Sequence, residues 1–207
     1  MSRLALCDVS GLFTDFLQKL SGEEGDQWLE AFKKMLRKEN PWSKLDEVWR
    51  TIKRDLVLDS PKTFLSALAE KNRNVNDWAK DIIGKPAFVE SLKELEQEYD
   101  LFVLTIAQLT GKKDTTSTTD EIFASVKRLG FQKCPAWVGL QLRLDYENQP
   151  NGECLFVAMK PIRALDGCLA VFRVRRDASG LWLRAVCAYP GFAWSPGHRW
   201  VVCRPRK

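Results

Sequence analysis

The residues best suited to recognition chemistry lie near the C-terminal end of the chain. Arg173 and Arg175 alternate with apolar residues, and Arg184 follows Trp182 at the same spacing of two. Alternate residues of a β-strand point to one face, so we expect these side chains to share an open surface. Guanidinium groups pair with phosphate or carboxylate, and aromatic rings stack on bases. The candidate nucleic-acid-binding residues are Arg143, Arg173, Arg175, Arg184 and Trp182.

The charge distribution agrees with this reading. The chain has a net charge of +5, and the segment from Cys134 onward holds 11 Lys and Arg against 5 Asp and Glu. The whole positive excess therefore lies in this segment, and nine of its cations are arginines. Trp194 and Trp200 are further candidate stacking platforms. The leading hypothesis is a non-enzymatic binding protein for RNA, single-stranded DNA or an acidic protein.

A different class of function is a small hydrolase or nuclease. His198 is the only histidine, so any nucleophile that needs an imidazole base must approach it. Ser195 lies three residues before it, and Cys187 or Cys203 would have to reach it across a sheet. This alternative places the reaction between the two halves of the chain.

Paired carboxylates are the second route to hydrolysis. Asp145, Glu147 and Glu153 flank one predicted hairpin, where carboxylates could act in general acid–base catalysis or in metal-assisted cleavage. The run from Glu153 to Lys160 lacks the D…E-x-K spacing of a metal-dependent nuclease. The sequence therefore assigns no catalytic residue.

Several function classes lack their motifs. No G-x-x-x-x-G-K-[ST] or G-x-G-x-x-G occurs, and the six cysteines form no C-x-x-C pair, so we expect neither cofactor nor metal. No run of eighteen apolar residues is present, which predicts no membrane span. Because Asp8 interrupts the N-terminus early, we expect no export signal and a cytoplasmic protein. Cys154, Cys168 and Cys187 are expected to be free thiols in apolar strands.

The first part of the chain, residues 1–98, reads as a helical region. Apolar residues recur at helical spacing, and Ser60-Pro61 is typical of a helix start. The predicted helices cover residues 1–20, a segment ending near residue 38, 44–54, the segment after Ser60, 75–83 and the segment from Pro86.

The second part, residues 99–207, reads as an α+β region. Residues 101–107 form an apolar run typical of a buried strand, and Thr118 with Glu121 fits a capping box. Alternation and turn residues then predict a five-stranded antiparallel meander. Its strands are predicted at 137–146, 153–160, 168–175, 181–189 and 199–203. The expected fold class is α+β, with the helical half packed on this meander.

Four segments carry a resemblance. They are DWAKDIIGKPAF at 77–88, CPAWVGLQLRL at 134–144, GLWL at 180–183 and RWVV at 199–202. Their order is similar to that in a family of uncharacterised bacterial proteins found in candidate-phylum genomes. The resemblance covers most of the chain beyond about residue 25. It implies a bacterial, cytosolic setting and brings no activity, cofactor or site residue with it.

Overall fold

The computed structural model describes residues 6–23, 25–36 and 47–206. The chain divides into two compact units, Met1–Asp46 and Glu47–Lys207. In the first unit, α1 (Leu6–Leu20) and α2 (Gly25–Leu36) contact each other, with the rings of Phe16 and Phe32 4.7 Å apart. Both helices were predicted from their apolar spacing. Within the described residues, no helix is long and apolar enough to cross a membrane.

The second unit is built on a mixed sheet of eight described strands. Their order is β1-β3-β10-β5-β7-β8-β2, and β6 pairs with β7 beside this path. The bounds are β1 Arg50–Lys53, β2 Asn74–Val75, β3 Glu98–Thr105, β5 Cys154–Val157, β6 Ile162–Arg163, β7 Leu169–Asp177, β8 Gly180–Cys187 and β10 Arg199–Pro205. Two further strands, β4 (Ser117–Thr118) and β9 (Ala193–Trp194), pair with each other in a small separate sheet.

The predicted α+β class is confirmed, but the five-stranded antiparallel meander is wrong. Strand β10 pairs with β5 in parallel and with β3 antiparallel, so it lies inside the sheet rather than at its edge. Strand β2 also pairs in parallel, with β8. The predicted regions 1–98 and 99–207 share one sheet, because β1 and β2 come from the first of them.

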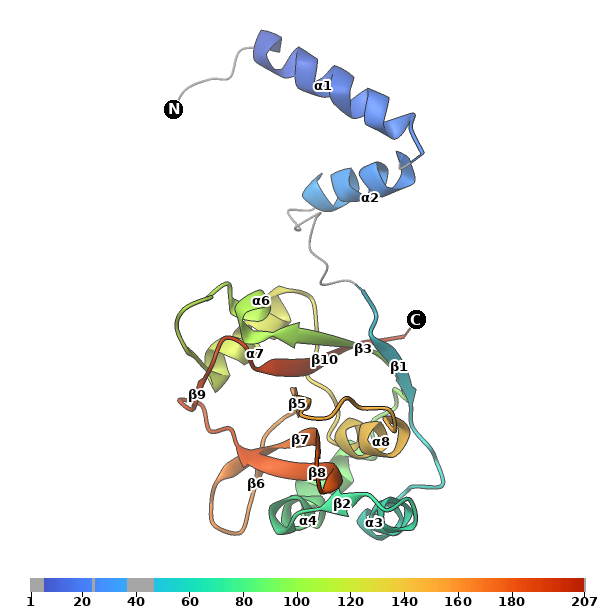
Figure 1. Cartoon of the computed structure of the whole chain (residues 1–207), viewed down its shortest axis with the longest axis vertical. Coiled ribbons are helices and arrows are strands. Elements are labelled where there is room, and N and C mark those ends of the chain that lie inside the picture. The colour runs from blue at the N-terminus through green and yellow to red at the C-terminus, as the bar shows by residue number, and fades with distance from the viewer. Residues whose placement is uncertain (1–5, 24, 37–46, 207) are drawn as a thin grey trace. The chain divides into compact units, whose positions relative to one another are not determined.

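Six helices complete the second unit. They are α3 Pro61–Glu70, α4 Asp77–Ile83, α5 Pro86–Ser91, α6 Ile106–Thr110, α7 Thr119–Arg128 and α8 Trp137–Asp145. The predicted helix starts at Ser60 and Thr118 are confirmed, since each side chain accepts a hydrogen bond from the backbone at position N3. In Figure 1, α6 and α7 lie beside β3 and β10, whereas α3, α4 and α8 lie toward β7 and β8.

The two faces of the sheet are covered differently. On one face, α8 and α5 bury the centre of β7: the ring of Phe172 lies 6.2 Å from that of Phe88 and directly under Gly139. On the other face, Trp200 of β10 packs against Phe123 of α7, with ring centroids 5.9 Å apart. The part of this second face formed by β5, β7 and β8 carries partly exposed side chains.

Residues 137–145 form α8, so the first strand of the meander, predicted at 137–146, is wrong. Every residue from Trp137 to Leu144 is buried, so the helix has no polar stripe to reveal a 3.6-residue period. The polar residues Gln141 and Arg143, which suggested a solvent face, are buried too. Alternation of polar and apolar residues was therefore misleading here, because both kinds face protein.

Residues 50–53 form β1, whereas a helix was predicted over 44–54. The part of that prediction at 44–46 lies outside the described residues. Ile52 is buried between exposed Thr51 and Lys53, which is the alternation of a half-buried strand. Pairing with β3 supplies the backbone hydrogen bonds, so tertiary contacts override the local helical spacing.

Two of the expected free thiols are joined. Cys168 and Cys187 form a disulfide, with their Cα atoms 6.0 Å apart. Cys168 immediately precedes β7, and Cys187 ends β8, so the bond ties two strands that are already paired. Among the described residues, Cys134, Cys154 and Cys203 remain free.

The contact of α8 with β7 leads to a stability prediction. A Cβ at Gly139 would lie 3.0 Å from Phe172 Cβ and Cδ2, so Gly139→Ala should destabilise the fold by about 1–3 kcal/mol through overpacking. This loss opposes the gain in helix propensity that alanine normally brings. Urea unfolding followed by circular dichroism measures the difference.

Gly84→Ala is the matched control for this prediction. Gly84 has φ −72°, and a Cβ there would come no closer than 3.4 Å to Asp81 O, so its stability should stay unchanged or rise by up to about 1 kcal/mol. Equal stability of the Gly139→Ala variant and the wild type would show that α8 does not pack on β7 in this way.

Candidate anion-binding face

Strand pairing brings four of the five predicted binding residues together. Arg173 is opposite Arg184, and Arg175 is opposite Trp182, in the antiparallel pair β7–β8. Directly opposed residues share a face of the sheet. We call Arg173, Arg175, Arg184 and Trp182 the basic face. Cys154 and Phe156 of β5 extend it, since they pair with Arg175 and Arg173.

Arg143 does not belong to the basic face, so its predicted placement there is wrong. It is fully buried on α8, where its guanidinium donates to Gln149 Oε1 at 2.5 Å, to Tyr146 O and to Arg175 O. Burial lowers the pKa of Arg143 to about 10. All three acceptors of its hydrogen bonds are carbonyl oxygens of the protein itself, so Arg143 has a structural role.

One carboxylate serves two arginines of the basic face. Asp177 Oδ2 lies 3.2 Å from Arg184 Nη2 and 3.5 Å from Arg175 Nε. The hydrogen bond from Ser179, and then these two guanidinium groups, hold the pKa of Asp177 below its usual range. Arg173 makes no ion pair with any described residue, and its guanidinium carbon lies 6.0 Å from the centre of the Phe156 ring. The basic face thus keeps a surplus of positive charge.

Trp182 is the aromatic residue of the basic face. Its indole Nε1 donates to Ser179 Oγ at 2.8 Å, and the guanidinium of Arg184 lies 4.3 Å from its ring centre. The indole is thereby held in place with part of its surface exposed. Trp194 and Trp200 are buried, so the prediction that they add stacking platforms is wrong.

A pocket of about 610 Å³ adjoins the basic face. We call it the β5–β7 pocket. The side chains that matter for its chemistry are Cys154, Phe156, Arg173, Arg175, His198 and Arg199. Strands β7, β5 and β10 are neighbours in the sheet, and this brings residues far apart in the sequence to one hollow.

His198, the only imidazole available to the hydrolase alternative, lies just before β10 and lines this pocket, half-buried. Its ring lies 5.1 Å from that of Phe156 and 5.8 Å from that of Trp194. Nδ1 is buried and has no hydrogen-bond partner among the described residues. Burial, with the charge of Arg173 nearby, lowers the pKa of His198. The imidazole is therefore less basic than that of an exposed histidine.

Arg199 and Glu153 form an ion pair at the rim, with Nη1 and Oε1 2.7 Å apart. Burial, and next the proximity of Glu153, raise the pKa of the Tyr146 hydroxyl to about 12. No spacing in the sequence indicates the Arg199–Glu153 pair, because its members are 46 residues apart: Arg199 begins β10, and Glu153 immediately precedes β5. It contributes no net charge to the pocket.

The residues proposed for hydrolysis do not converge. Asp145 accepts from Gln141 Nε2 at 3.1 Å, Glu147 pairs with Arg73 at 2.8 Å, and Glu153 pairs with Arg199. No group of three His, Cys, Asp or Glu side chains able to hold a metal occurs among the described residues. The carboxylate route thus has no assembled site in this part of the chain.

The thiol route has no activated nucleophile among the described cysteines. Cys187 is in the disulfide, and Cys203 is fully buried. Cys154 does line the pocket with His198, but burial raises its pKa despite the nearby arginines. A thiol with a raised pKa is protonated at neutral pH and is a poor nucleophile.

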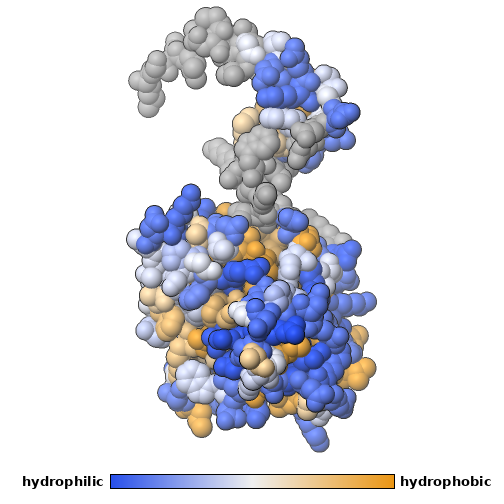
Figure 2. Space-filling view, in the orientation of Figure 1, coloured by the Kyte–Doolittle hydropathy of each residue, from blue (hydrophilic) through white to orange (hydrophobic). Residues whose placement is uncertain are grey.

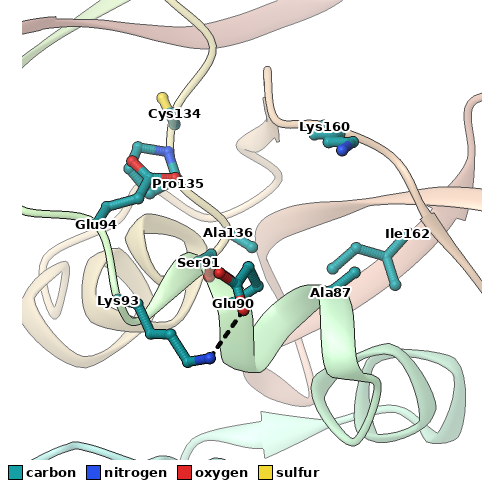
Figure 3. Close-up of a pocket in the computed structure, with 10 residues that line it drawn as sticks. All are labelled: Ala87, Glu90, Ser91, Lys93, Glu94, Cys134, Pro135, Ala136, Lys160 and Ile162. Carbon is teal, nitrogen blue, oxygen red and sulfur yellow. Dashed lines mark hydrogen bonds and ion pairs between the residues drawn. The ribbon is translucent and has the colours of Figure 1, made fainter.

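A second pocket lies beside α5 and the start of α8. Figure 3 shows Glu90 and Lys93 joined to each other, with Cys134, Lys160 and Ile162 on other segments around the hollow. The Glu90–Lys93 pair is exposed, and burial raises the pKa of Cys134 well above its usual range. This pocket presents no surplus charge of the kind found at the basic face.

Comparison of the chain with protein-family models, with curated proteins and with solved structures finds no match. The kinship with a bacterial family, suggested by the four sequence segments, therefore stays a prediction.

The burial of Arg143 leads to a prediction. Arg143→Met should lower the free energy of unfolding by about 3 kcal/mol, because Gln149 Oε1 and two backbone carbonyls lose their donor. Arg175→Met is the control and should cost less than about 1 kcal/mol, since its ion pair is solvent-exposed. Denaturant titration of both variants decides the matter, and equal losses would contradict a structural role for Arg143.

Proposed function

We propose that this protein binds single-stranded nucleic acid, RNA or DNA, through the basic face, without catalysing a reaction. The observation that carries the proposal is the pairing of Arg173 with Arg184 and of Arg175 with Trp182 on one partly open strand surface. Cations hold phosphates, and a flat ring beside them stacks on unpaired bases.

The charges support an anionic ligand. The basic face has three arginines and one neighbouring carboxylate, that of Asp177, which pairs with Arg175 and Arg184. In the view of Figure 2, hydrophilic and hydrophobic residues are interspersed over the surface of residues 47–206. Because the basic face consists of three arginines and one partly exposed indole, we expect ion pairs and stacking to hold the ligand.

The basic face has one partly exposed tryptophan, Trp182, and this argues for a short contact. With Trp194 and Trp200 buried, the described face offers stacking for a base at Trp182 and phosphate contacts around it. An acidic protein is the other ligand with which such a face is compatible. It lacks bases, so Trp182 favours nucleic acid over it. No specific observation favours the hydrolase.

The cytoplasmic, bacterial setting that the sequence suggests stays a prediction. A reducing cytosol keeps most thiols free, so the Cys168–Cys187 bond weighs against this location. The proposed binding does not depend on the compartment.

Charge reversal on the basic face is the direct experiment. The double variant Arg173→Glu/Arg175→Glu should bind a fluorescent single-stranded oligonucleotide at least about tenfold more weakly in dilute salt. Each lost phosphate contact removes about 0.7 from the slope of log K against log salt, so the slope should fall by about 1.4. Fluorescence anisotropy over a range of salt concentrations gives both numbers.

The matched control is Lys53→Glu/Lys62→Glu, which makes the same change in net charge. Lys53 is exposed on β1, at the other end of the sheet, and Lys62 is exposed on α3, which packs on α8. Binding and slope should stay close to those of the wild type. Equal loss in both double variants, or no binding by the wild type in dilute salt, would refute the proposed function.

A further inference from the structure

We propose that the β5–β7 pocket is a phosphomonoester site, which in the function proposed above receives the terminal phosphate of a nucleic-acid strand. The source of the phosphate rests on that function, whereas the chemistry of the site rests on the pocket itself. With this site, the protein would recognise the phosphorylated end of a nucleic acid as well as its backbone.

The pocket brings donors together from opposite sides. Arg173 and Arg175 come from β7. On the other side, Arg199 is the first residue of β10, and His198 immediately precedes it. Between them lies Phe156 of β5, which pairs with Arg173 on one side and with Trp200 on the other. An anion over β5 is therefore within reach of both sets.

The charge of this region matches a dianion. Arg173, Arg175 and Arg184 carry three positive charges against the one of Asp177, and Arg199 is neutralised by Glu153. The formal surplus is two. A phosphomonoester carries about −1.5 to −2 at pH 7, whereas an internal phosphodiester carries only one negative charge.

Four side chains of the pocket lining have a buried polar atom without a hydrogen-bond partner among the described residues: the nitrogens are on Arg173, Arg175 and His198, and the one oxygen is Glu153 Oε2. Arg173 makes no ion pair with a described residue, and its Nε has no partner there. His198 Nδ1 is likewise buried without a partner. Buried polar groups normally have partners, so such positions point to a polar ligand.

The arginines are partly positioned in advance. Asp177 holds Arg175 and Arg184, and the ring of Phe156 lies beside Arg173. Ordering a long side chain upon binding costs free energy, and these contacts reduce that cost. The site is thus prepared for an anion before the anion arrives.

Two loops form part of the pocket boundary. Besides β5 and β7, the pocket is lined by Pro150–Gly152 and by Gly197–Arg199. The hollow is open to solvent, so the end of a strand can enter it. The preference for a terminal over an internal phosphate rests on the charge of the site.

His198 provides a direct readout, because it is the only histidine and gives one set of imidazole proton signals. The charged groups that share its pocket are Arg173, Arg175, Arg199 and Glu153, and the thiol of Cys154 also lines it. In the unbound protein, burial and then the charge of Arg173 lower the pKa of His198. A bound dianion favours the imidazolium, so a nucleoside 5′-monophosphate should raise this pKa.

The first experiment is an NMR titration of wild-type His198 against pH. It is run with a nucleoside 5′-monophosphate, with inorganic phosphate and with the unphosphorylated nucleoside, each at constant ionic strength. The two phosphates should raise the pKa of His198, and the nucleoside should not. An unchanged pKa with both phosphates would overturn the phosphomonoester site.

The second experiment compares three oligonucleotides of one sequence by anisotropy: 5′-phosphorylated, 3′-phosphorylated and unphosphorylated. At least one phosphorylated end should bind about tenfold more tightly than the unphosphorylated strand, the factor that one charge-assisted hydrogen bond supplies. Which end gains identifies the source of the phosphate. Equal affinity for all three would overturn end recognition.

Two neutral variants separate the pocket from the rest of the face. Arg173→Gln should abolish the difference between phosphorylated and unphosphorylated strands. Arg184→Gln changes an arginine outside the pocket lining and should weaken all three strands by a similar factor. Both side chains are partly exposed, so thermal unfolding should show intact folds. The same loss of discrimination in both variants would contradict the assignment of Arg173.

The outcomes distinguish the two proposals. If no oligonucleotide binds in dilute salt but phosphate and the mononucleotide still shift His198, the site stands and the nucleic-acid function falls. If strands bind equally and His198 does not respond, the function stands and the site falls.

Discussion

The hydrogen bonds of buried Arg143 fix the relation between α8, β7 and the segment that leads into β5. Arg143 bonds to Gln149, and Gln149 Nε2 in turn donates to the backbone carbonyls of Val174 and Glu153. Arg176 donates back to Gln149 O at 2.8 Å. Buried polar networks hold a unique arrangement when their members are bonded. Here the network sets β7 against the loop that bounds the β5–β7 pocket.

This constraint explains why the side chains suited to binding lie on one face of the sheet. The covered face of β7 is buried and tightly packed, as the contact of Phe172 with Gly139 shows. Alternation along β7 then directs Arg173 and Arg175 to the opposite face. Because β8 and β5 flank β7, Arg184, Trp182 and the pocket residues assemble around them. The disulfide between Cys168 and Cys187 joins the other end of the same strand pair.

The sequence predicted features that depend on local pattern. The alternation of polar and apolar residues predicted strands β7 and β8. Because a short turn joins them, they were expected to pair, and this pairing predicts that Arg173, Arg175 and Arg184 lie around Trp182. Helix caps at Ser60 and Thr118 were found because their signals lie within four residues. These predictions needed no knowledge of distant contacts.

Features that depend on distant contacts were missed. Arg143 looked like a surface residue because a buried arginine cannot be told from an exposed one without its partners. The parallel pairing of β10 with β5 places His198 and Arg199 beside Phe156, and no spacing in the sequence reveals it. The pairing of Cys168 with Cys187 likewise depends on the strand register.

The most direct test of the account is an amide and indole NMR spectrum recorded while a single-stranded oligonucleotide is added in dilute salt. The account predicts that the largest shift changes fall on β5, β7 and β8 and on the Trp182 indole, with α3 and β1 unaffected. The account would be contradicted if the shift changes were concentrated on α3, on β1 or on the Met1–Asp46 unit while the signals of the basic face stayed unchanged.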